Sequence, residues 1–134
     1  WADVKMDVHD IPFSENTFDV VICNHVLEHV EDSHKVMCEF YRVMKPGGWG
    51  IFQVPIDTNN PNTEEDKSVT DPKERERLYW QDDHLRLFGL DYGKKLATAG
   101  FKVTESDFIN ELDLKLVERY ALPKGEIIYF CEKE

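Results

Sequence analysis

The chain has 134 residues, 41% of them hydrophobic, and carries 16 basic against 27 acidic side chains, which gives a net charge of -11. This length predicts a single domain, residues 1–134, with one hydrophobic core. The negative charge would repel a phosphate backbone and an anionic membrane surface, so we expect neither nucleic acid nor membrane as a partner.

Cysteine usage and hydropathy indicate the compartment. Cys23, Cys38 and Cys131 are odd in number and lie in apolar surroundings, which is typical of buried, reduced thiols. No apolar stretch approaches the roughly 20 residues that cross a bilayer, and no signal-peptide pattern stands at the start. We therefore expect a soluble, cytoplasmic protein.

Strand and helix signals alternate along the first half of the chain, as in an open α/β sheet. Residues 2–8 alternate as a strand, and residues 18–23 are apolar and β-branched, which predicts a central parallel strand covered on both faces. Apolar residues at three- and four-residue spacing predict a helix over 32–44. Pro46-Gly47-Gly48 cannot continue that helix, and residues 49–54 form the next predicted strand.

The second half contains a long polar segment, residues 56–80, which we interpret as an insertion that is either mobile or a lid over a site. Asp71 and Pro72 predict a short helix inside it. A helix is predicted at 111–120, beyond the insertion, and its residues Leu112, Leu116 and Val117 are expected to face inward. The patterns beyond the insertion predict a helix, a strand, that second helix and a closing strand, at 91–100, 101–104, 111–120 and 127–131.

Several of these segments together resemble a known family. They are Asp7 to Phe13, Phe18 to Asn24, Leu27-Glu28-His29-Val30, Glu39 to Gly48 and Ala99-Gly100-Phe101. In this order they are similar to the C-terminal two-thirds of a class I S-adenosylmethionine-dependent methyltransferase. The resemblance implies a Rossmann-like sheet ordered 3-2-1-4-5-7-6, of which this chain supplies strands three to seven, with strand seven antiparallel.

The resemblance also implies what the chain does. The complete protein is expected to transfer a methyl group from S-adenosylmethionine to a small-molecule acceptor. Strands one and two, with the glycine-rich loop that approaches the methionine part of the cofactor, have no counterpart in the 134 residues. We therefore expect the chain to begin within the fold, and the 134-residue polypeptide by itself to bind the cofactor poorly and to be inactive.

The family's cofactor contacts fall on two segments of this sequence. Asp7 matches the acid that accepts a hydrogen bond from the adenine amino group, and the N–H of Val8 would meet a ring nitrogen. Asn24, His25 and Val26 follow strand four, where the backbone lies against the methionyl part of the cofactor and the acceptor. In open α/β sheets this is also where the strand order reverses and ligands bind. The structural alternative is that Asp7 only caps the turn after a strand.

Three further side chains are candidates for contact with the acceptor. His29 and His84 could take a proton from a hydroxyl or amine, and Arg86 could pair with an anionic acceptor. The structural alternative, a histidine hydrogen-bonded to a loop carbonyl and an arginine on the surface, is at least as good an interpretation. Methyl transfer is an in-line displacement that depends mainly on alignment, so it requires no fixed catalytic side chain.

Two other functions remain open. One is a noncatalytic, methyltransferase-like interaction module. The other is a zinc hydrolase, because His25, Glu28 and His29 satisfy the pattern H-x-x-E-H. That pattern needs a long helix, whereas His25 directly follows a strand, so we expect no metal site. An exposed sheet edge could also pair residues 2–8 with residues 18–23, or with a second copy in a strand-swapped homodimer.

Overall fold

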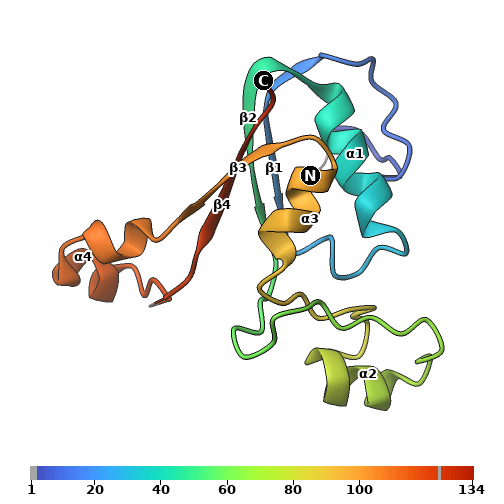
Figure 1. The fold of residues 1–134 in the computed structure, drawn as a ribbon, viewed down its shortest axis with the longest axis vertical. Helices are drawn as coiled ribbons and strands as arrows, with labels where there is room; N and C mark the ends of the chain where they lie inside the picture. The colour runs from blue at the N-terminus through green and yellow to red at the C-terminus, as the bar shows by residue number, and fades with distance from the viewer. Residues whose placement is uncertain (1–2, 124) are drawn as a thin grey trace.

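The computed structural model describes residues 3–123 and 125–134. Within this part of the chain, a sheet of four strands is combined with short helices (Figure 1). In chain order the elements are β1 (Phe18–Asn24), α1 (Ser33–Val43), β2 (Met44–Gln53), α2 (Pro72–Tyr79), α3 (Tyr92–Thr98), β3 (Lys102–Ser106), the 3₁₀ turn η1 (Phe108–Glu111), α4 (Leu114–Arg119) and β4 (Ile128–Glu132).

The strands are ordered β1-β2-β4-β3. β1 and β2 are parallel, and Asn24 lies opposite Gln53 at their carboxyl ends. β4 runs antiparallel to both of its neighbours, β2 and β3. This order confirms the α/β fold class expected from the sequence, and it reproduces the part 4-5-7-6 of the implied sheet with the last strand antiparallel.

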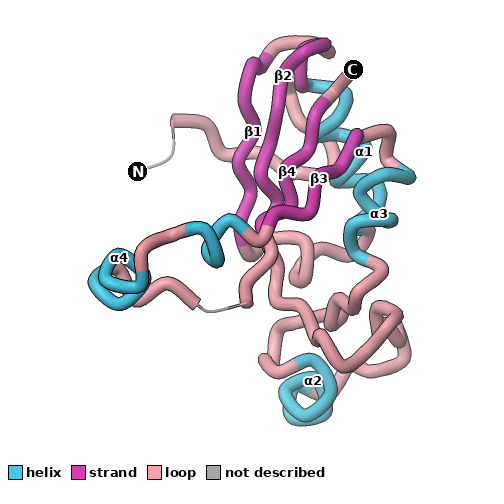
Figure 2. The backbone as a smooth tube through the Cα atoms, turned by 60° about the vertical axis from the view of Figure 1, so that its left-hand side comes forward, coloured by secondary structure: helices cyan, strands magenta, loops and turns pink. Residues whose placement is uncertain are grey.

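The hydrophobic core lies between the sheet and the helices α1 and α3, which lie on the same side of it (Figures 1 and 2). Phe52 of β2 stacks on Phe40 of α1 with ring centroids 5.2 Å apart. From α3, the Tyr92 hydroxyl donates a 3.0 Å hydrogen bond to the Phe52 carbonyl. These contacts fix the orientation of β2, and therefore the position of the loop that follows it.

Helix α1 begins as the sequence predicts. The Asp32 carboxylate accepts a 2.9 Å hydrogen bond from the N–H of Lys35 and so caps the helix. Its end differs slightly from the prediction, because β2 starts at Met44 and not at residue 49. Gly47, with φ of 76°, lies within this early part of β2, where the pairing with β1 is irregular.

Two predictions about the start of the chain are wrong for the described residues. Residues 3–8 form no strand and do not pair with β1. β1 therefore lies at the edge of the sheet, and it is not covered on both faces, since Ile22 is 61% exposed. A strand needs a neighbouring backbone to hydrogen-bond with, and alternation in residues 2–8 could not show whether the chain supplies one.

The segment between β3 and β4 also departs from the prediction. In place of one helix over 111–120 it forms η1 and the short helix α4, which stand away from the sheet (Figure 1). Val117 is buried, but Leu116 is exposed, because this arm has no large surface to pack against. Among the cysteines, Cys131 is buried as expected, whereas Cys38 is exposed on α1.

The insertion of residues 56–80 packs against the segment before α3. Isolated bridges join Ile56 to Phe88 and Glu64 to Leu87. Asp71 caps α2 through a 3.0 Å hydrogen bond from the N–H of Lys73, as predicted. The described helices are all too short or too polar to cross a membrane.

Candidate functional site

An open, mainly apolar groove of about 510 Å³ lies along β1. Val8, Asn24 and Val26, three of the five residues expected at the cofactor, line it together with the exposed side chains of β1. Asp7 directly precedes Val8 but is not among the lining residues. The structure thus brings the turn at residues 7–10 and the end of β1 to one groove.

Asp7 organises the turn next to this groove. Its Oδ1 accepts a 2.9 Å hydrogen bond from the N–H of His9 and lies 2.8 Å from His9 Nδ1. The backbone hydrogen bond from His9, supported by the ring contact, lowers the pKa of the Asp7 carboxyl below its usual value. Because both contacts use Oδ1, the turn-capping role leaves Oδ2 for a further donor.

His25 lies between Asn24 and Val26, which line the groove, and itself lines a second pocket. Its backbone has φ of 55°, a left-handed conformation that ends β1, and its N–H donates a 2.8 Å hydrogen bond to the Gln53 carbonyl. Its ring lies 3.2 Å from Glu28 Oε1 and is 64% exposed. The second pocket has a volume of about 370 Å³, and His25 is one of its lining residues.

The second pocket contains residues that the sequence analysis did not select. Gln53 lies at the carboxyl end of β2, as Asn24 does at the end of β1. Its side-chain amide donates to the Ile127 carbonyl and accepts from the N–H of Tyr129, both at 2.9 Å. The sequence signal that could have identified Gln53 is its position at the end of a predicted strand. The large apolar side chains of the pocket come from four segments, and they are Pro55, Ile56, Trp80, Leu90, Pro123, Ile127 and Tyr129.

His29 and His84 lie next to each other, with ring centroids 4.7 Å apart. His84 is buried, and its Nδ1 lies 2.7 Å from the Tyr79 carbonyl. Nδ1 of His29 lies 3.3 Å from the Asp83 carboxylate. Neither residue is among those that line the groove along β1 or the second pocket. His25 therefore occupies the place at the pocket wall that was expected for them.

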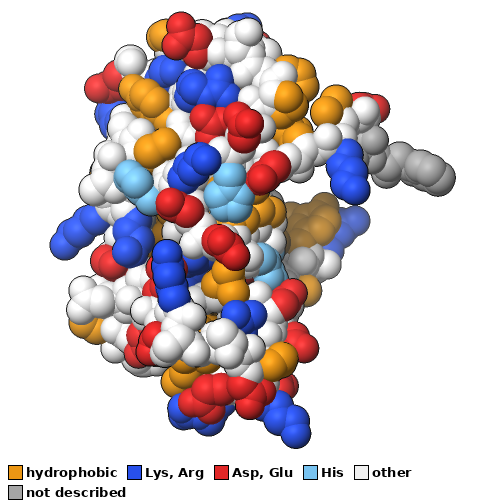
Figure 3. Space-filling model, turned by 90° about the vertical axis from the view of Figure 1, so that its right-hand side faces the viewer, with side chains coloured by type: hydrophobic (Ala, Val, Ile, Leu, Met, Phe, Trp, Pro, Cys, Tyr) orange, Lys and Arg blue, Asp and Glu red, His pale blue; other side chains and the backbone are white. Residues whose placement is uncertain are grey.

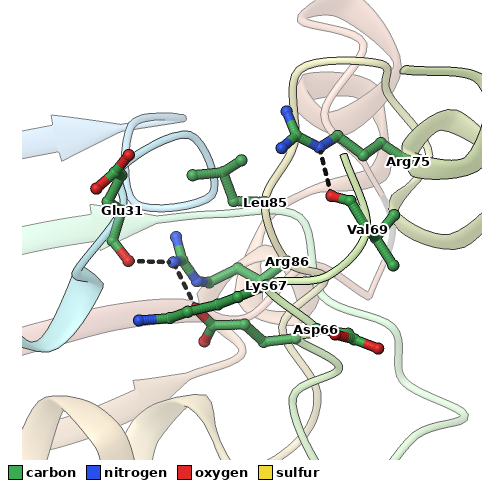
Figure 4. A pocket seen from close by; sticks show the side chains of 8 residues that line it. Glu31, Asp66, Lys67, Val69, Arg75, Leu85 and Arg86 are labelled. Atoms are coloured by element: carbon green, nitrogen blue, oxygen red, sulfur yellow. Dashed lines mark hydrogen bonds and ion pairs between the residues drawn. The ribbon is translucent and has the colours of Figure 1, made fainter. Parts of the chain in front are cut away.

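Arg86 does not lie on the surface, which was its alternative interpretation, but is buried with a structural role. The guanidinium is 1% exposed and donates hydrogen bonds to the carbonyls of Leu27 and Val30, at 2.6 and 2.5 Å. It also donates to the Glu31 carbonyl at 3.0 Å and to the Glu65 carboxylate at 2.8 Å (Figure 4). Through these hydrogen bonds Arg86 links the loop after β1 to the insertion. Arg86 is not among the residues that line the second pocket.

The zinc-peptidase pattern does not have its required geometry. Residues 25–30 form turns and no helix, so His25 and His29 do not lie on adjacent helical turns. A zinc hydrolase built on His25, Glu28 and His29 is therefore not supported.

The molecular surface shows no broad patch of a single charge sign in the view of Figure 3, where acidic and basic side chains are interspersed.

Comparison with known proteins gives the class to which this fold belongs. Residues 2–52 match the family model described as "Methyltransferase domain". The ubiquinone/menaquinone biosynthesis C-methyltransferase UbiE of Desulfotalea psychrophila is 45% identical over 55 residues, which are 41% of this chain and 21% of that protein. The chain thus covers about a fifth of the length of this curated relative.

Solved structures match nearly the whole chain. The [4+2]-cyclase SpnF has a TM-score of 0.62 at 16% identity, over 96% of this chain and 55% of that chain. Geranyl diphosphate C-methyltransferase from Streptomyces coelicolor, in complex with Mg²⁺, geranyl diphosphate and S-adenosyl-L-homocysteine, has a TM-score of 0.60 at 14% identity, over 96% and 51%. These likenesses show the fold, while the cyclase shows that the fold alone does not set the reaction.

The chain thus has the fold of class I S-adenosylmethionine-dependent methyltransferases, and residues 2–52 are similar in sequence to the methyltransferase domain. The four described strands lie in the order β1-β2-β4-β3, which corresponds to the part 4-5-7-6 of the sheet expected for this class.

Proposed function

We propose that the protein transfers a methyl group from S-adenosylmethionine to an apolar small-molecule acceptor. The observation that carries this proposal is the groove at the end of β1, which Val8, Asn24 and Val26 line together. The family match over residues 2–52 includes both segments of the groove and supports the same function.

In the proposed complex the adenine lies at the turn that starts with Asp7. The carboxylate of Asp7 carries a lowered pKa and is ionised at neutral pH, so Oδ2 can accept a hydrogen bond from the adenine amino group. The Val8 N–H supplies the neighbouring donor. The backbone at Asn24 and His25 then directs the methionine part toward the second pocket.

The acceptor is proposed to occupy the second pocket, beside His25. The side chains of Trp80, Leu90 and Tyr129 give this pocket a largely apolar lining, which suits a ring or hydrocarbon. The names of the two relatives, a quinone-pathway C-methyltransferase and a geranyl diphosphate C-methyltransferase, are consistent with an apolar acceptor. We propose that residues 56–80, which contribute Thr58 and Trp80 to the wall, act as a lid over it.

Calorimetric titration of the natural full-length protein with S-adenosylhomocysteine tests the cofactor site. Asp7→Ala removes the proposed adenine acceptor and should weaken binding about 10- to 100-fold, as expected for a hydrogen bond to a charged group. Asp10→Asn, three residues further along the same exposed turn, is the matched control and should bind as the wild type does. Equal affinity in all three proteins would contradict the proposed role of Asp7.

Incubation with radiolabelled S-adenosylmethionine and a set of aromatic and prenylated acceptors tests the reaction. Cofactor binding without transfer to any acceptor would favour the alternative of a noncatalytic module.

The edge of the sheet at β1 raises the question of a partner strand, because an exposed edge can pair with a further strand of the same protein or with a second copy. We propose the former, and a monomer in sedimentation of the natural protein would agree with it.

A further inference from the structure

A cluster of two histidines and one carboxylate lies next to His25, a lining residue of the proposed acceptor pocket. Glu28, His29 and His84 each offer a ligand atom, and these atoms all lie within 4.8 Å of one another. Glu28 and His29 come from the loop after β1, and His84 comes from the segment after α2. We infer that these three residues bind a divalent transition-metal ion, with Zn²⁺ as the ion that suits them best.

The first observation that points to an ion is the state of Glu28. Its side chain is only 1% exposed, and its Oε2 is buried without a hydrogen-bond partner among the described residues. Its Oε1 lies 3.2 Å from His25 Nδ1 and 4.0 Å from His29 Nε2. A buried carboxylate with an unpartnered oxygen is costly in free energy, and a bound cation would compensate for it.

The second observation is the orientation of the two imidazoles. His84 Nδ1 is held by the Tyr79 carbonyl at 2.7 Å, so this nitrogen is the protonated one and Nε2 carries the free lone pair. His29 Nδ1 lies 3.3 Å from Asp83 Oδ2, which leaves its Nε2 toward Glu28. Metal-binding histidines usually have their second nitrogen held in this way by a carbonyl or a carboxylate.

The donor set selects the kind of ion. Two imidazole nitrogens and one carboxylate oxygen suit Zn²⁺, which accepts such ligands in a tetrahedral arrangement, and they are less suited to Mg²⁺ or Ca²⁺, which prefer oxygen. Tetrahedral ligand atoms at usual Zn²⁺ distances lie about 3.3 Å apart, so closing around the ion takes shifts of about 1 Å or less per side chain. His29 is 29% exposed and gives an entry path.

Such an ion would fasten the loop after β1 to the segment that follows the insertion. These two segments are already joined by the hydrogen bond from the N–H of Leu85 to the Glu28 carbonyl, at 2.9 Å. The proposed site shares Glu28 and His29 with the H-x-x-E-H peptidase pattern but differs from it, because His84 takes the place of His25 as the second imidazole. It also departs from the expectation, drawn from the sequence, that the chain has no metal site.

Metal content and Zn²⁺ affinity of the natural full-length protein, purified without a histidine tag, test the inference. After incubation with Zn²⁺ and removal of excess, the wild type should retain one ion per chain at this site, measured by mass spectrometry. Glu28→Gln and His84→Gln should weaken Zn²⁺ binding at least about 100-fold. His34→Gln, which changes an exposed histidine on α1, is the matched control and should bind as the wild type does.

Two further measurements keep the test decisive if a core variant folds poorly. Asp83→Asn changes a largely exposed side chain that orients His29, and it should weaken Zn²⁺ binding about 10- to 100-fold. Co²⁺ in place of Zn²⁺ should give the visible absorption of a tetrahedral site with nitrogen and oxygen ligands. Equal Zn²⁺ binding in wild type, Glu28→Gln and Asp83→Asn would show adventitious binding and overturn the inference. A wild type that binds no Zn²⁺ would also overturn it, whatever the result of the methyl-transfer assay.

Discussion

Replacement of Arg86 by alanine should cause a large loss of stability, although the residue is an arginine with no role at the proposed pocket. The guanidinium is 1% exposed and donates to the carbonyls of Leu27, Val30 and Glu31 and to the Glu65 carboxylate. Arg86→Ala would leave these acceptors without their donor. At about 1 to 3 kcal/mol for each buried acceptor left unpaired, and with partial rehydration at Glu31 and Glu65, the free energy of unfolding should fall by about 3 to 5 kcal/mol.

Two variants separate the hydrogen-bond geometry from the charge. Arg86→Lys keeps the positive charge, but one ammonium cannot reach all of these acceptors, so we expect a loss of about 2 kcal/mol. Arg77→Ala removes an exposed arginine that pairs with Glu74 on the surface of α2, and it should change stability by no more than about 0.5 kcal/mol.

The assay is urea unfolding followed by far-ultraviolet circular dichroism, with the midpoints compared at an unchanged slope. If Arg86→Ala unfolded at the same urea concentration as Arg77→Ala, the four hydrogen bonds would contribute no net stability and the reasoning would be refuted.

Three further predictions concern the sheet, α1 and the cysteines. Gly50→Ala would place a methyl group 2.7 Å from a carbonyl oxygen of β1, so we expect about 1 to 3 kcal/mol of destabilisation in the same assay. The hydrogen bond from Arg42 lowers the pKa of Glu39 below 4.5, so the stability that Glu39 contributes is present above that pH and is lost as the pH falls through the native pKa. The stability difference from Glu39→Gln should therefore be full at pH 7 and shrink below about pH 4.5; a constant difference would contradict this. A thiol reagent should modify the exposed Cys38 rapidly in the native protein but Cys131 only on unfolding. Cys131 is buried, and burial raises its pKa to about 12, so its reactive thiolate form is scarce. Equal modification rates for the two cysteines would contradict this prediction.

Local patterns in the sequence determined most of the elements. The cap at Asp32 and the apolar spacing after it were sufficient to predict α1, and Asp71 with Pro72 was sufficient for the start of α2. These signals depend on neighbouring residues, whose contacts a helix or turn fixes by itself. The strand order was expected from the family resemblance, and the described residues confirm it from β1 to β3.

Contacts between distant segments were decided only by the tertiary structure. Leu27 and Arg86 are 59 residues apart, and nothing in either segment indicates that the guanidinium would bind that carbonyl. In the same way, Glu28 and His29 formed one motif in the sequence, but His84 joined them only when the segment after α2 packed against the loop after β1. Periodicity shows which side of an element is buried, whereas its partner depends on how the whole chain crosses over and packs.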